Sequence, residues 1–156
     1  MHDALLHSMN ALITDELLSH AEMDVKVSVL SCITKITRIT TPDAPYDDEK
    51  MKEVFQLTVA AFEKLSHVSS RCYTKAVSIL DTVAKVRSCL VMLDLECDAL
   101  VVEMFQTFFK TISANHPHDV FSAMEVIMTM VIDEDDDISL DLLSSLIAIS
   151  SCKKGK

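Results

Sequence analysis

Glycine and proline are scarce in this chain of 156 residues, which contains one glycine and three prolines. Folds built from strands and tight turns use glycine where the backbone needs a positive φ angle, so the scarcity favours an all-α architecture. The single glycine, Gly155, lies in the last residues of the chain. A glycine-rich loop that cradles phosphate groups is therefore excluded.

Long apolar runs and a secretory signal are also missing. Hydrophobic residues make up 49% of the chain, but no apolar run approaches the roughly 18 to 20 residues that cross a bilayer. The first ten residues, MHDALLHSMN, lack the basic start and the unbroken apolar centre of a signal peptide. We therefore expect a soluble, intracellular protein that has no contact with membranes.

The chain also has fewer basic than acidic residues, and its cysteines lack the spacing typical of a metal site. The formal net charge of −10 repels phosphate backbones, so direct binding of nucleic acid is not expected. The five cysteines form an odd set without C-x-x-C or framework spacing, which indicates reduced thiols rather than disulfides or a metal site. They are Cys32, Cys72, Cys89, Cys97 and Cys152. We expect core thiols and no cofactor.

What the sequence does contain is helical periodicity. It is clearest from Asp24 to Thr40, where apolar residues recur every three or four positions on one helical face. These residues are Val25, Val29, Cys32, Ile33, Ile36 and Ile39. Asp24 is expected to cap the first turn, and Pro42 and Pro45 prevent the helix from continuing. The acidic run 47–49 then supplies the first turn of the next helix.

The same spacing predicts helices along most of the remaining chain. The predicted ranges are 3–13, 14–18, 47–65, 73–93, 98–112, 117–132 and 139–149. Asp98 is expected to cap the helix that it begins. The helix at 73–93 has apolar residues on more than one side, so it should be the most buried element. Residues 133–137 are too charged to be buried and are interpreted as a solvated turn.

These helices fall into antiparallel pairs near 3–40, 47–94 and 98–132, with starts 45 to 50 residues apart. That period is typical of HEAT repeats, which bury their apolar faces by stacking on one another. The prediction is an α-solenoid of HEAT-like helical hairpins with about seven helices, forming one segment over 1–150. The helix at 139–149 is a remnant, and 151–156 is a polar tail. A compact helical bundle is the alternative. Uncovered end helices would favour self-association.

No catalytic, cofactor-binding or metal-binding residue stands out. His116 and His118 flank a proline and are interpreted as part of a surface loop. Asp133, Asp135 and Asp137 resemble the start of a calcium loop, but Ile138 stands where such a loop needs glycine. No serine or cysteine has a nearby histidine pattern typical of nucleophilic catalysis.

Two long segments resemble one known family. They run from Asp24 to Leu57 and from Val77 to Phe109, and they include RITTPDAPYDD and SCLVMLDLECD. Both are similar to the amino-terminal region of the precocious-dissociation-of-sisters (Pds) family, which comprises cohesin-associated HEAT-repeat proteins. The similarity extends over nearly the whole chain and is greatest to plant members.

The resemblance implies a non-enzymatic, protein-binding scaffold in the nucleus that acts as a cohesin cofactor, regulates sister-chromatid cohesion and supports DNA repair. The implied partners are the kleisin subunit of cohesin and the Wings-apart-like releasing factor. No residues that match the inositol-phosphate site of animal relatives are identified. Two alternatives remain open. One is a generic HEAT-repeat adaptor for other partners, and the other is an enzyme accessory subunit or latent hydrolase using Cys72 or Cys89.

Overall fold

The fold was analysed in a computed structural model, which describes residues 2–112, 115–135, 140 and 144. These residues form eight α-helices and one short 3-10 helix, with no strand among them. The elements are α1 (His2–Leu12), α2 (Asp15–Leu18), α3 (Met23–Thr40), α4 (Asp48–Phe62), the 3-10 helix η1 (Glu63–Ser66), α5 (Tyr73–Val86), α6 (Ser88–Asp94), α7 (Asp98–Thr111) and α8 (His118–Glu134). The predicted all-α class is confirmed. The remnant at 139–149 and the tail at 151–156 lie outside the described residues, except for Leu140 and Ser144.

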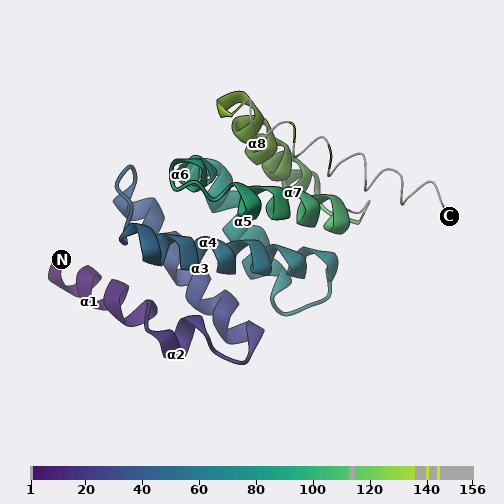
Figure 1. The fold of residues 1–156 in the computed structure, drawn as a ribbon. Coiled ribbons are helices and arrows are strands. Elements are labelled where there is room, and N and C mark those ends of the chain that lie inside the picture. The colour runs from purple at the N-terminus through teal and green to yellow at the C-terminus, as the bar shows by residue number, and fades with distance from the viewer. Residues whose placement is uncertain (1, 113–114, 136–139, 141–143, 145–156) are drawn as a thin grey trace.

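The helices stack in two layers (Figure 1). One layer contains α3, α5 and α8, where α5 contacts both of the others, and the second contains α4 and α7. Within the first layer the helices run parallel, because Asp24 contacts Cys72 and Ser28 contacts Lys75 in the same order along α3 and α5. In chain order α3, α4, α5, α7 and α8 alternate between the layers, as in a HEAT-like α-solenoid.

A single core fills the space between the layers. Its largest fully buried side chains come from every helix of the stack from α3 to α8. Phe62 from α4 and Phe108 from α7 have ring centroids 5.2 Å apart and planes tilted by 42°, an arrangement that aromatic pairs prefer to a face-to-face stack. The core is therefore shared between neighbouring helical pairs rather than divided among them.

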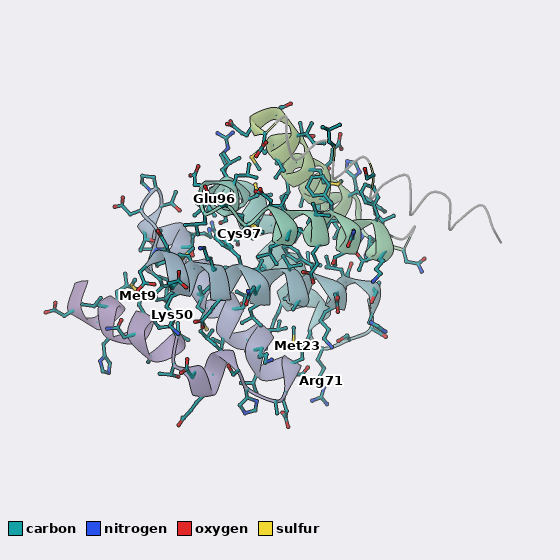
Figure 2. All side chains as sticks on the ribbon, viewed as in Figure 1. Met9, Met23, Lys50, Arg71, Glu96 and Cys97 are labelled. Carbon is teal, nitrogen blue, oxygen red and sulfur yellow. The ribbon has the colours of Figure 1, made fainter. Side chains whose placement is uncertain are left out.

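The amino-terminal helices are held on the stack by polar contacts. The Tyr46 hydroxyl donates a hydrogen bond of 3.0 Å to the carbonyl oxygen of Met9 in α1. Lys50 in α4 forms ion pairs with Asp15 of α2 at 3.4 Å and with Glu53 at 3.2 Å. Met9 of α1 and Lys50 of α4 are labelled in Figure 2. Burial raises the pKa of Tyr46 to about 12, so this hydroxyl remains a donor at neutral pH.

Only one of three predicted acidic helix starts has a side-chain cap. Asp47 precedes α4, and its carboxylate accepts a hydrogen bond of 2.9 Å from the Lys50 amide, so the acidic first turn predicted at 47–49 is confirmed. The predicted caps at Asp24 and Asp98 are wrong. Both residues lie inside the first turn of their helices, and the residues before them make no side-chain cap bond. Their negative charges are still stabilised by the positive end of the helix dipole.

The helix predicted at 73–93 is broken at Arg87, which has φ of 58° and ψ of 34°. α5 ends at Val86 and α6 begins at Ser88. The change of direction lets α6 bury Cys89 and Met92 and reach α7 and α8. Burial of these side chains outweighs the cost of a left-handed arginine, which is about 1 kcal/mol or more. Sequence periodicity had no signal for this break.

Two expectations about burial are corrected. The most buried element among the described residues is α4, with eight buried residues of its 15, whereas α5 has five of 14 and α6 has two of seven. α4 is covered by α2, α3, α5 and α7, so it occupies the centre that we had assigned to 73–93. In α3, Cys32 and Ile39 are exposed, because the buried face instead includes Val27 and Leu30.

Within the described residues, none of the helices combines the length and the apolar character that crossing a bilayer requires.

The end of α6 is a helix termination of the Schellman type without glycine. Glu96 has φ of 56°. Its amide donates to the Leu93 carbonyl oxygen, and the Cys97 amide donates to the Met92 carbonyl oxygen, each at 3.0 Å. This pair of bonds normally has glycine at the left-handed position. Glu96 is labelled at that corner in Figure 2.

We predict that Glu96→Gly stabilises the fold because it relieves the left-handed strain. The free energy of unfolding should rise by about 0.5–1 kcal/mol relative to Glu96→Ala, which keeps a side chain at this φ angle. The measurement is guanidinium unfolding followed by circular dichroism. As a control, Glu125→Gly in the middle of α8 should destabilise by about 1 kcal/mol. Equal losses at the two positions would contradict the prediction.

Candidate functional site

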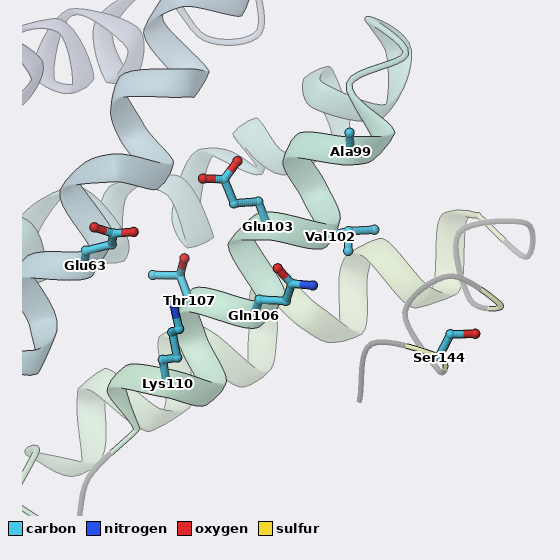
Figure 3. Close-up of a pocket in the computed structure, with 8 residues that line it drawn as sticks. All are labelled: Glu63, Ala99, Val102, Glu103, Gln106, Thr107, Lys110 and Ser144. Atoms are coloured by element: carbon cyan, nitrogen blue, oxygen red, sulfur yellow. The ribbon is translucent and has the colours of Figure 1, made fainter. Parts of the chain in front are cut away.

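An open groove runs along the outer side of α7 (Figure 3). It has a volume of about 740 Å³. Its lining residues come mainly from α7, with one from η1, and they are Glu63, Ala99, Val102, Glu103, Gln106, Thr107, Lys110 and Ser144. Successive turns of α7 therefore present a small apolar strip, Ala99 and Val102, beside charged and amide groups. Such a mixture is typical of the surfaces that proteins use to bind other proteins.

The groove continues toward the end of η1. A second concavity of about 390 Å³ shares Glu63, Thr107 and Lys110 with the first. It also includes Lys64 and His67, so the shared floor is bordered by both signs of charge. The buried Thr107 and Thr111 keep this side of α7 in contact with the core. We define the two concavities together as the α7 groove and take it as the candidate functional site.

The two cysteines considered as nucleophiles are buried thiols. The Cys72 Sγ donates a hydrogen bond of 2.9 Å to the carboxylate of Asp24. Burial and this carboxylate both raise the pKa of Cys72. Burial raises the pKa of Cys89 to about 11. Among the described residues no histidine makes a hydrogen bond to either sulfur. Both thiols therefore stay protonated at neutral pH, whereas nucleophilic catalysis needs the thiolate.

The interpretation of His116 as a surface-loop residue is wrong. Its side chain is buried, with 6% of its surface exposed. Nε2 donates to the Thr111 carbonyl oxygen at 2.7 Å, which leaves Nδ1 to accept a hydrogen bond from the Tyr73 hydroxyl at 2.8 Å. The imidazole stacks on the Tyr73 ring and meets Phe121 edge-on. His116 thus fixes the turn between α7 and α8 on the start of α5.

Nothing in the local sequence could have indicated this role, because Tyr73 lies 43 residues away. His118, in contrast, is exposed as expected, but it is the first residue of α8 rather than part of a loop. α8 continues to Glu134, so Asp133 is helical rather than part of a turn, and Asp137 lies outside the described residues. No group of three or more potential metal ligands occurs in the described part of the chain.

Comparison with known proteins assigns the family. The family model described as "Sister chromatid cohesion protein PDS5 protein" matches residues 1–150. This chain belongs to the PDS5 family. The resemblance predicted from the segments 24–57 and 77–109 is therefore confirmed.

PDS5 proteins of plants are the more similar of the curated relatives. The chain is 58% identical over 148 residues to "Sister chromatid cohesion protein PDS5 homolog D" of Arabidopsis thaliana, covering 95% of this chain and 18% of that protein. It is 49% identical over 140 residues to PDS5 homolog A of the same plant, covering 90% and 9%. Identity to PDS5 of Saccharomyces cerevisiae is 27% over 135 residues, covering 86% and 10%. The chain spans less than a fifth of the length of these relatives.

A solved structure has the same fold. The chain superimposes with a TM-score of 0.75 and 27% identity on a chain in "Structure of the Pds5-Scc1 complex and implications for cohesin function", covering 87% of this chain and 20% of that one. The predicted HEAT-like α-solenoid of a PDS5 protein is therefore confirmed. The compact bundle considered as the alternative is not observed.

We predict that the buried thiols of this PDS5 chain resist alkylation. With iodoacetamide near pH 8, the exposed Cys32 should react first, while Cys72 and Cys89 should require unfolding, because burial blocks access and their raised pKa values keep them protonated. Peptide mass mapping measures the rates, and guanidinium provides the fully reactive control. Asp24→Asn should speed the reaction of Cys72, since it removes a carboxylate that raises the pKa. Native Cys72 reacting as fast as Cys32 would contradict this expectation.

Proposed function

We propose that this chain is a non-enzymatic, protein-binding scaffold that associates with cohesin and regulates sister-chromatid cohesion in the nucleus. The observation that carries the proposal is the likeness to the solved Pds5-Scc1 chain, together with 58% identity to a named sister chromatid cohesion protein. A role in DNA repair is part of the proposal through the family resemblance. The protonated thiols support a scaffold rather than a catalyst.

The proposed partners are the kleisin subunit of cohesin and the Wings-apart-like releasing factor. The chain would present them with outward helix faces, with residues 1–150 acting as one HEAT-repeat segment built from the pairs near 3–40, 47–94 and 98–132. We place the kleisin contact in the α7 groove, where the half-buried Val102 is flanked by the exposed Glu103 and Lys110. A partner helix or strand lying there would cover the apolar strip and leave the charged border in contact with water.

We predict that the immobilised chain captures purified kleisin. Val102→Asp should weaken this capture about tenfold, because burying a carboxylate without a partner costs about 1.4 kcal/mol or more of binding free energy. Ile39→Asp on α3, where the side chain is 68% exposed, is the control and should bind normally. A pull-down from nuclear extract with mass spectrometry tests the releasing factor. Capture of neither protein would leave only the generic HEAT-repeat adaptor.

Self-association through the ends of the stack is a second part of the proposal. On α8, Val126 and Ile132 are 46% and 47% exposed, and on α1 Leu6 is 52% exposed. In a solenoid such positions are covered by the next repeat. A second copy of the chain would bury the same apolar surface and keep it from water.

We predict that sedimentation velocity shows association that increases with protein concentration. The double variant Val126→Lys with Ile132→Lys should shift the chain toward the monomer, since two charges oppose burial of this face. Ile39→Lys, at a position that is 68% exposed on α3, is the control and should leave the association unchanged. A monodisperse wild-type monomer that melts cooperatively would contradict the prediction.

A further inference from the structure

Positive charge is concentrated on one part of this acidic chain. α3 and the segment from Arg71 to Arg87 contain seven of the chain's 14 lysines and arginines but only two of its 24 acidic residues. These two stretches thus have a net charge of +5 within a chain of net charge −10. They are also neighbours in space, because α3 and α5 lie side by side in one layer.

Six of the seven basic side chains are exposed on this layer, and we call them the basic face. They are Lys35, Arg38, Arg71, Lys75, Lys85 and Arg87. The seventh, Lys26, instead lines a concavity between α2, α3 and α4. The parallel contacts described above show that the two helices start at the same end. Arg71 and Lys75 therefore lie beside the first half of α3, and Lys35 and Arg38 lie toward the end at which α5 has Lys85 and Arg87.

The acidic residues within the face neutralise little of its charge. Asp81 forms an ion pair of 2.8 Å with Lys85, and Asp24 accepts the hydrogen bond from Cys72. Lys75 donates to the Ser28 hydroxyl at 2.6 Å rather than to a carboxylate. Among the described residues, no ion pair involves Lys35, Arg38 or Arg71.

Helix dipoles explain only part of this arrangement. Arg38 in the last turn of α3 and Lys85 in the last turn of α5 lie where the helix dipole favours a cation. Arg71 and Lys75 lie at the opposite end of α5, where the dipole disfavours positive charge and where the first turn contains no acidic residue. Stability of the isolated helix therefore does not account for these two residues, whereas attraction of an anionic partner does.

The neighbouring helix limits the size of that partner. α8 follows α5 in the same layer, and it has four acidic residues and no lysine or arginine. Asp119 of α8 faces Asp81 and Lys85 across the groove between the two helices. A long, stiff polyanion would meet this negative border. α3 itself is about 27 Å long, which matches roughly eight residues of extended peptide.

We propose that the basic face, formed by α3 and α5, binds a short acidic segment of a partner protein. Carboxylates of the segment pair with the unpartnered Lys35, Arg38 and Arg71, and the segment stays within the width of the two helices. Attraction between exposed charges acts mainly on specificity and on the association rate, and salt screens it. The basic face lies in the layer that does not contain α7, so its test is independent of kleisin capture in the α7 groove.

The test uses the complete chain and a fluorescein-labelled deca-glutamate peptide in a fluorescence anisotropy titration. Lys35→Glu combined with Lys75→Glu reverses one charge on each helix and should weaken binding about tenfold or more. The control, Lys52→Glu on α4 combined with Lys154→Glu in the polar tail 151–156, makes the same change in net charge at residues that belong neither to the basic face nor to the α7 groove, and it should change affinity by less than about threefold. Circular dichroism checks that both variants fold, and the corresponding pair of alanine substitutions replaces any that does not.

Each outcome decides the proposal. Binding that is lost with Lys35 and Lys75, kept in the control and weakened by salt supports it. The proposal is overturned if the wild-type chain does not bind the peptide, or if the two double variants lose affinity equally. It is also overturned if a 20-base-pair duplex DNA binds more tightly than deca-glutamate and depends on the same lysines, since the surface would then recognise nucleic acid.

Discussion

The structure depends on the mutual burial of apolar helix faces between two layers. The helices depend on this packing, because most helical stability in proteins comes from burial of an amphipathic face. The contact between Phe62 and Phe108 is an example, because it joins α4 to α7, the neighbouring helix of the same layer. α4 contacts α2, α3, α5 and α7, so changes in its packing reach helices on both sides of it along the stack. The outward faces of the helices do not take part in this packing.

Periodicity predicted the helices but not their exact partners. The all-α class and most helix boundaries followed from spacing, from the prolines at 42 and 45, and from the acidic start at Asp47. The buried face of α3 is rotated by part of a turn from the predicted one. Cys32 and Ile39 fit the same apolar stripe as Ile33 and Ile36, so they were predicted to be buried with them. A stripe wider than the surface that covers it leaves such residues exposed, and only the position of the neighbouring helix decides which ones.

Two turns of the backbone could not be predicted, because residues other than glycine occupy their left-handed positions. Arg87 and Glu96 take the left-handed conformation that glycine adopts without steric cost, so the usual sequence signal for ending α5 and α6 was absent. Their cost is met by the burial of Cys89 and Met92 between them. His116 was hidden for another reason, since its partners Tyr73 and Thr111 meet it only after α5, α7 and α8 have packed. The α7 groove likewise depends on the side-by-side placement of η1 and α7, which spacing along one helix does not encode.

The polar groups of the core are paired within the protein. The threonines at 58, 82 and 111 donate to carbonyl oxygens one turn earlier in their own helices, and His116 is bonded through both nitrogens. In the described part of the chain no buried side-chain nitrogen or oxygen lacks a partner. The exposed cations are instead concentrated on α3 and α5, whereas α8 in the same layer has acidic residues and no lysine or arginine. Exposed charges of this kind contribute little to the free energy of folding.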